Sequence, residues 1–163
     1  MKNHNMRQQL VQLGNGAHAL ATQMLGNAED ATDAVHDVFV RLLRKPDAYD
    51  VSKGPLKPWF LRVLRNHCID LIRQRRPGHS AVEELSDPGP GPQAALEIAQ
   101  RDQGLQLALA KLSAGQRQII VLRDYMDLSY AEIATALEIA PGTVMSRLHR
   151  ARLALREELT RHG

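Results

Sequence analysis

The sequence is poor in aromatic residues and lacks runs typical of β-strands. Phe, Trp and Tyr together make up 4% of the 163 residues. Strands are enriched in aromatic and β-branched residues that alternate with polar ones, and we find no such segment. We therefore expect an all-α protein.

Cysteine and recognisable site motifs are also scarce. Cys68 is the single cysteine, so no internal disulfide can form. The seven histidines lack the spacing to a second ligand that metal motifs show. There is no Gly-rich phosphate loop, no nucleophile motif and no spacing that suggests paired carboxylates. We expect no catalytic residue, metal, cofactor or small-molecule substrate, and hence not an enzyme.

Long hydrophobic runs are absent, and residues 1–13 are polar. The sequence therefore predicts neither a membrane-spanning helix nor a signal peptide, and we expect a cytoplasmic protein without membrane insertion. Lys and Arg outnumber Asp and Glu by 21 to 18, and the pI is about 9.3. Arginines gather in two clusters: Arg62, Arg65, Arg73, Arg75 and Arg76, and Arg147, Arg150, Arg152, Arg156 and Arg161. One cluster alone is equally typical of a solvated surface, but two favour a polyanionic partner.

Proline and glycine are concentrated in one segment, residues 77–93, which reads PGHSAVEELSDPGPGPQ. This composition excludes a regular helix and predicts a semi-extended linker. The chain is therefore predicted to consist of two small helical domains, residues 1–76 and residues 94–163, joined by this linker.

The first domain has helical apolar spacing and clear stop signals. One helix is predicted over residues 8–25, ending at Gly26. A second follows the N-cap Asn27 and stops before Pro46. A loop over residues 46–58 then leads to a helix from Trp59 to Arg75.

The second domain contains the signature of a helix-turn-helix. A helix is predicted over residues 94–111, and a second begins at Ser113 with a capping box. Another capping box, Ser129 with Glu132, starts a short helix over residues 130–137. Pro141 suits the first position of the last helix. Two helices joined by such a tight turn, the second rich in arginine, are typical of DNA-binding proteins.

On a helical wheel the last helix has two distinct faces. Val144, Leu148, Ala151 and Leu155 form a narrow apolar stripe that should pack on the preceding helices. The opposite face carries Met145, Ser146, His149 and Arg150, flanked by Arg147 and Arg152 as phosphate-contacting residues would be. An ordinary amphipathic surface helix would show a similar pattern, but the agreement of cap, proline and arginine face favours DNA binding.

Three segments resemble one protein family in its own order and spacing. Residues 112–155 resemble region 4 of the extracytoplasmic-function (group 4) sigma-70 factors. Residues 28–44, AEDATDAVHDVFVRLLR, resemble region 2.2, and residues 49–76 resemble regions 2.3 and 2.4. The resemblance implies a sigma factor that binds core RNA polymerase and directs promoter recognition and transcription initiation, for a stress- or signal-responsive regulon.

The resemblance also implies partners and sites. Region 2.2 in the family docks on the clamp helices of the largest polymerase subunit, and the matching outer-face residues are Asp33, His36, Asp37 and Val40. Region 4 implies a contact with the flap of the second-largest subunit, and the family implies an anti-sigma partner. The minus-10 promoter element should be contacted by Tyr49, Lys57, Trp59, Arg62, Asn66 and Arg73, although Trp59 at a helix start is more typical of a core residue. The minus-35 element should be contacted by Thr143, Met145, Ser146, Arg147, His149 and Arg150.

Three positions depart from the family's usual residues. His36 replaces a usual Gln, Met145 stands where a basic residue is common, and Glu138 replaces the usual Gly of the helix-turn-helix turn. A left-handed conformation at Glu138 costs roughly 1 kcal/mol.

Two other functional classes compete with this interpretation. A helix-turn-helix regulator that binds DNA without polymerase would not explain the first domain. A helical adaptor that binds only proteins would not explain the arginine face of the last helix.

Overall fold

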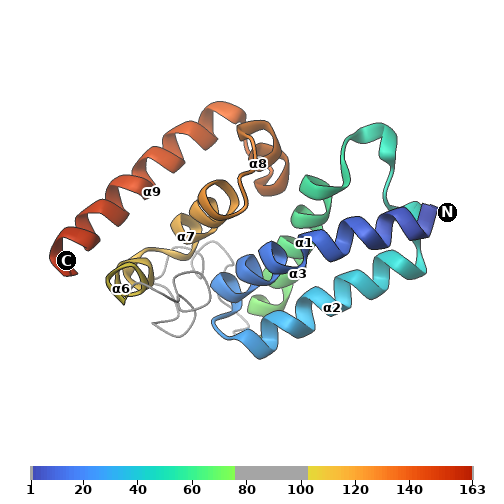
Figure 1. Cartoon of the computed structure of the whole chain (residues 1–163), viewed down its shortest axis with the longest axis horizontal. Coiled ribbons are helices and arrows are strands. Elements are labelled where there is room, and N and C mark those ends of the chain that lie inside the picture. Colours follow the sequence, from blue (N-terminus) through green and yellow to red (C-terminus); the bar gives the residue numbers. More distant parts are fainter. Residues whose placement is uncertain (1, 76–102, 163) are drawn as a thin grey trace.

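The computed structural model describes residues 2–75 and 103–162, and every regular element in these ranges is helical (Figure 1). The predicted linker, residues 77–93, and the start of the helix predicted over residues 94–111 lie outside them. The all-α fold class is confirmed. The first half comprises α1 (Lys2–Leu25), α2 (Ala28–Arg44), the short 3₁₀ turns η1 (Pro46–Ala48) and η2 (Val51–Lys53), and α3 (Leu56–Arg75). The second comprises α6 (Gln103–Lys111), α7 (Ala114–Ile120), the π-helical turn η3 (Val121–Tyr125), α8 (Tyr130–Leu137) and α9 (Pro141–His162).

Local signals set the ends of α2 as predicted. Gly26, with a φ of 91°, follows the end of α1. The Asn27 Oδ1 atom then accepts a hydrogen bond from the backbone N–H of Asp30 at 2.8 Å and so caps α2. The helix ends at Arg44, before Pro46.

Two predicted helix starts were wrong. α1 begins at Lys2 rather than Gln8, and Met6, within this extra stretch, is 4% exposed. α3 begins at Leu56 rather than Trp59. Pro58 lies in its first turn, where a missing N–H costs no helical hydrogen bond. In both places burial of an apolar side chain extends the helix beyond the local sequence signal.

Both predicted capping boxes are present in the second half. The Ser113 hydroxyl accepts from the N–H of Gln116 at 3.2 Å. The Ser129 hydroxyl accepts from the N–H of Glu132 at 3.1 Å, and the Glu132 carboxylate accepts from the N–H of Ser129 at 2.9 Å. α8 therefore spans residues 130–137 and α9 starts at position 141, as predicted.

The two halves pack against one another rather than standing apart. α3 lies against α8, and α1 lies against α7 and η3, so that α9 and α2 occupy opposite sides of the molecule (Figure 1). Arg117 of α7 is 1% exposed and donates to the carbonyl oxygens of Leu112 (2.6 Å) and Gln23 of α1 (3.2 Å). Gly16 of α1 leaves room for Met126, since a Cβ there would lie 2.8 Å from the Met126 Sδ. None of the described helices is both long and apolar enough to cross a membrane.

Candidate promoter and polymerase interfaces

α9 is oriented as its apolar stripe predicts. Val144, Leu148 and Ala151 are fully buried, and Leu155 is half-buried. This stripe anchors α9 across α6, α7 and α8. Because this stripe is buried, the opposite face of α9 points toward solvent.

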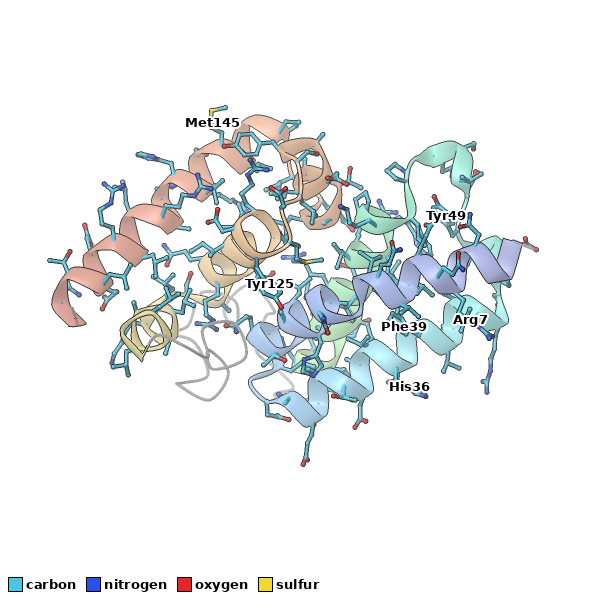
Figure 2. All side chains as sticks on the ribbon, in the orientation of Figure 1. Arg7, His36, Phe39, Tyr49, Tyr125 and Met145 are labelled. Carbon is cyan, nitrogen blue, oxygen red and sulfur yellow. The ribbon has the colours of Figure 1, made fainter. Side chains whose placement is uncertain are left out.

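The outward face of α9 carries five of the six residues expected at the minus-35 element. Met145 is 59% exposed and points away from the body of the molecule (Figure 2). Ser146, Arg147, His149 and Arg150 are also exposed. The sixth residue, Thr143, is half-buried in the first turn and accepts a hydrogen bond through its carbonyl from the Ser146 hydroxyl at 3.1 Å.

The two predicted flanking arginines differ in their partners. Arg152 binds Asp124 of η3 through Nη2 at 2.6 Å and Nε at 3.3 Å. This hydrogen bond raises the pKa of the Arg152 guanidinium. Because Asp124 offsets its charge, Arg152 is less suited than Arg147 to bind a phosphate.

Glu138 adopts the left-handed conformation that its position in the turn requires. Its φ and ψ are 58° and 46°, and it ends α8. The N–H of Ile139 then donates to the carbonyl of Ala134 at 3.0 Å. The turn therefore has the geometry usually given to glycine, and a glutamate side chain projects from it.

The outer face of α2 carries three of the four residues expected to dock on polymerase. Asp33, His36 and Asp37 are exposed, and His36 points away from the helical bundle (Figure 2). Val40 is half-buried, so the prediction of an openly exposed apolar residue there was only partly correct. Sequence reasoning also missed His67 of α3, whose Nε2 lies 3.3 Å from the Asp37 carboxylate.

Tyr49 and Trp59 form an aromatic pair at the loop before α3. Tyr49 is 8% exposed, its hydroxyl donates to the carbonyl of Gly54 at 2.6 Å, and burial raises its pKa. The ring centroids of Tyr49 and Trp59 are 5.1 Å apart. Trp59 is half-buried against the core. In this conformation both rings support the loop from within.

Three of the other minus-10 residues contact acidic side chains of α8 and stay partly exposed to solvent. The Lys57 Nζ lies 3.6 Å from the Glu132 carboxylate. The Arg62 Nε lies 3.9 Å from the Glu138 carboxylate, and the Asn66 side-chain amide donates to the same carboxylate at 3.2 Å. Arg73 lies near the far end of α3, 3.9 Å from Asp70. The sequence did not predict that Glu132 and Glu138 would contact α3, and the unusual acid at position 138 was the one feature that stood out there.

An open groove of about 530 Å³ lies beside this contact, lined by residues that include Arg65, Gln118, Arg147 and Arg150. The Arg65 Nε donates to the Gln118 side chain at 3.0 Å. Burial lowers the pKa of Arg65, nearby Glu138 raises it, and the positive charge of Arg147 lowers it further. The three arginines in its lining make the groove positively charged.

No group of three metal-ligating side chains occurs in the described ranges. Cys68 is buried, and burial raises its pKa to about 12. This agrees with an inert thiol.

Comparisons with known proteins cover both halves. The model of Sigma-70 region 2 matches residues 10–77, and that of Sigma-70 region 4 matches residues 102–155. The extracytoplasmic-function (ECF) RNA polymerase sigma factor SigW of Bacillus subtilis is 30% identical over 154 residues, which cover 87% of this chain and 82% of SigW. SigL of Mycobacterium tuberculosis, also an ECF sigma factor, is 35% identical over 150 residues, covering 88% and 82%. The ECF sigma factor SigE of Mycolicibacterium smegmatis is 33% identical over 153 residues, and the match covers 90% of this chain and 58% of SigE.

Solved structures share the architecture. The sigma factor RpoE, in complex with the anti-sigma factor NepR from Bartonella quintana, is 28% identical with a TM-score of 0.72, and the match covers 96% of this chain and 97% of that one. CnrH, in complex with the cytosolic domain of CnrY, is 27% identical with a TM-score of 0.67, covering 96% and 88%. The chain therefore belongs to the ECF RNA polymerase sigma factors of the sigma-70 family.

Proposed function

We propose that residues 1–76 act as sigma region 2, that residues 94–163 act as region 4, and that residues 77–93 connect them. In this proposal the protein brings core RNA polymerase to promoters of a stress- or signal-responsive regulon. The observation that carries it is the match of both region models in order, together with an α9 whose outer face is polar and exposed. The protein would act on DNA in the cytoplasm, by binding and without catalysis or a cofactor of its own.

The minus-35 element is assigned to the outer face of α9. Ser146, His149 and Arg150 are exposed and lie opposite the buried stripe, where a recognition helix presents side chains to the major groove. A selection of minus-35 variants from a random pool, with reconstituted holoenzyme, tests this. His149→Ala and Ser146→Ala should change the selected motif. The assignment is wrong if both variants select the wild-type motif with equal strength.

Core polymerase is assigned to the outer face of α2, with the clamp helices of the largest subunit as its partner. The flap of the second-largest subunit is the proposed partner of region 4. Asp33 and His36 are exposed on this face and suit a protein partner. Asp33→Arg combined with His36→Ala should abolish co-purification with polymerase. Glu157→Arg, an exposed acid on α9, is the charge-matched control and should co-purify normally.

This experiment also separates the proposal from its rival. A helix-turn-helix regulator that works without polymerase would bind DNA equally well with or without the core enzyme, and wild-type protein would not co-purify with it. Failure of the wild-type chain to bind core polymerase would therefore overturn the proposed function.

The minus-10 element is assigned to α3 and its preceding loop, through Lys57, Arg62, Asn66 and Arg73. Tyr49 and Trp59 support this loop through their paired rings, and a rearrangement would be needed for either ring to stack on a base. An anti-sigma partner is proposed as well, because both solved relatives are described in complexes: RpoE with NepR, and CnrH with the cytosolic domain of CnrY.

A further inference from the structure

A histidine interrupts an apolar row on the side of α3 that contacts α2. Val63 and Leu71, one helical turn before and one turn after His67, are half-buried and pack against the core. The side chain of His67 is itself only 14% exposed. Because burial of a polar ring is unfavourable unless its nitrogens are hydrogen-bonded, the partners of His67 indicate why a histidine occupies this position.

Both ring nitrogens of His67 contact charged side chains of α2. The Nδ1 atom lies 2.8 Å from Nη2 of Arg41, and the Nε2 atom lies 3.3 Å from the Asp37 carboxylate. A guanidinium can only donate hydrogen bonds, so Nδ1 is the acceptor and carries no proton. The proton of the neutral ring is then on Nε2, which donates it to Asp37. The hydrogen bonds therefore run in one direction, from Arg41 through His67 to Asp37.

The imidazole stands between two opposite charges on the outer face of α2. Asp37 and Arg41 are four residues apart with the acid first, which is the spacing and order that favours a direct ion pair on a helix. Both residues are exposed, the Asp37 side chain to 56%. A neutral ring orients the carboxylate without cancelling its charge. Both charges are therefore held in place and stay available to a partner.

From these contacts we infer that His67 is a positioning residue for the polymerase-docking face of α2, and that Arg41 belongs to this face. His67 acts through its neighbours: it fixes the Asp37 carboxylate and the Arg41 guanidinium before binding, so that less side-chain freedom is lost when the complex forms. The partner surface would then offer a cation opposite Asp37 and an acid opposite Arg41. The inference rests on the proposed function of α2.

Three variants separate positioning from packing. His67→Leu fills the site with an apolar side chain but removes both hydrogen bonds. His67→Gln keeps both, because its amide oxygen can accept from Arg41 while its amide N–H donates to Asp37. Asp37→Ala combined with Arg41→Ala removes the two groups that His67 would position. Arg156→Ala combined with Glu157→Ala, an exposed base and an exposed acid of α9, is the matched control.

The first measurement is the affinity of each full-length variant for core RNA polymerase, in competition with fluorescein-labelled wild type. His67→Leu should bind about three- to tenfold more weakly than wild type, the range expected when an orienting hydrogen bond is lost. His67→Gln should restore most of this affinity, and the α9 control should bind as wild type does. Adding His67→Leu to the Asp37 and Arg41 double variant should cause no further loss.

Two results of this competition would overturn the inference. One is equal affinity of wild type and His67→Leu. The other is an equal loss in His67→Leu and His67→Gln, since the ring would then act only by filling space. Failure of the wild-type chain to bind core polymerase would instead overturn the proposed function.

The second measurement reports on the ring itself and does not depend on polymerase. In the full-length wild-type chain, with ¹⁵N-labelled histidines, long-range NMR spectra distinguish a protonated ring nitrogen from an unprotonated one. The signals of His67 are those that disappear in His67→Gln. Near neutral pH, His67 should show a single tautomer with the proton on Nε2. A mixture of tautomers, or a proton on Nδ1, would overturn the directed contact from Arg41 to Asp37, whatever the affinities.

Discussion

The two helices proposed to read the promoter, α3 and α9, are presented very differently. α9 buries Val144 and Leu148 and leaves its polar face open to solvent. On α3, Arg62 and Asn66 face Glu138 of the other half. The free protein therefore leaves the surface proposed for duplex DNA open, whereas part of the surface proposed for an unpaired strand contacts the other half. Since both helices carry arginine clusters, composition alone does not distinguish a face open to solvent from one that contacts the other half.

The largest effect should come from shortening a side chain on the buried face of α9, compared with one on its exposed face. Leu148→Ala removes a fully buried side chain and should lower the free energy of unfolding by about 2–5 kcal/mol. Met145→Ala on the exposed face of the same helix should change it by no more than about 0.5 kcal/mol. Urea denaturation followed by circular dichroism measures both. Similar losses in the two variants would mean that α9 is not oriented as described.

DNA binding by the open face should respond next most strongly. Arg150→Ala should reduce discrimination among minus-35 variants by about 1–3 kcal/mol if the side chain is bidentate to guanine. Arg147→Ala should instead weaken binding to all DNA sequences alike. It should also reduce by about one the slope of the logarithm of the binding constant against the logarithm of salt concentration, as for a phosphate contact. Titrations of duplex DNA with holoenzyme at several salt concentrations separate the two. Equal behaviour of the two variants would contradict the distinction between reading and anchoring residues.

The contrast between α3 and α9 also shows what local sequence can predict. The caps at Asn27, Ser113 and Ser129 were predictable because each bond joins residues three apart. The face of α9 followed from helical periodicity alone. The start of α1 was not predictable, because Met6 is helical through burial against distant residues rather than through a local signal.

The contacts of α3 escaped prediction for the same reason. Asn66 and Glu138 are far apart in sequence and meet only because the two halves pack together. The sequence pattern predicted that Glu138 lies in the turn and has a left-handed backbone. It did not predict that the Glu138 carboxylate would contact α3. Residue types and helix faces were therefore accessible from sequence, whereas pairing across the halves was not.

A smaller effect should appear at high pH on the inner side of α3. Burial raises the pKa of Cys68 from 9.0 to about 12. The unfolded chain loses this proton at lower pH than the folded protein, so unfolding is favoured as pH rises from about 9 to 12, and the full contribution of the thiol to stability is present below 9. Cys68→Ala should weaken this dependence of the unfolding free energy on alkaline pH, measured by urea denaturation. An identical pH profile in the variant would contradict burial of the thiol.

The smallest effect should be seen when the Glu138 contact with α3 is removed and Cys68 is used as a reporter. Cys68 is fully buried, whereas Asn66 lies on the face toward α8 and is exposed. If Glu138→Gly removes only this surface contact, the inner side of α3 stays packed on α1 and α2, and the rate at which a thiol reagent labels Cys68 should not change. Leu64→Ala, which removes a fully buried neighbour on the same helix, should accelerate labelling and serves as the positive control. Rapid labelling of Glu138→Gly would mean that the α8 contact supports the fold of α3 itself.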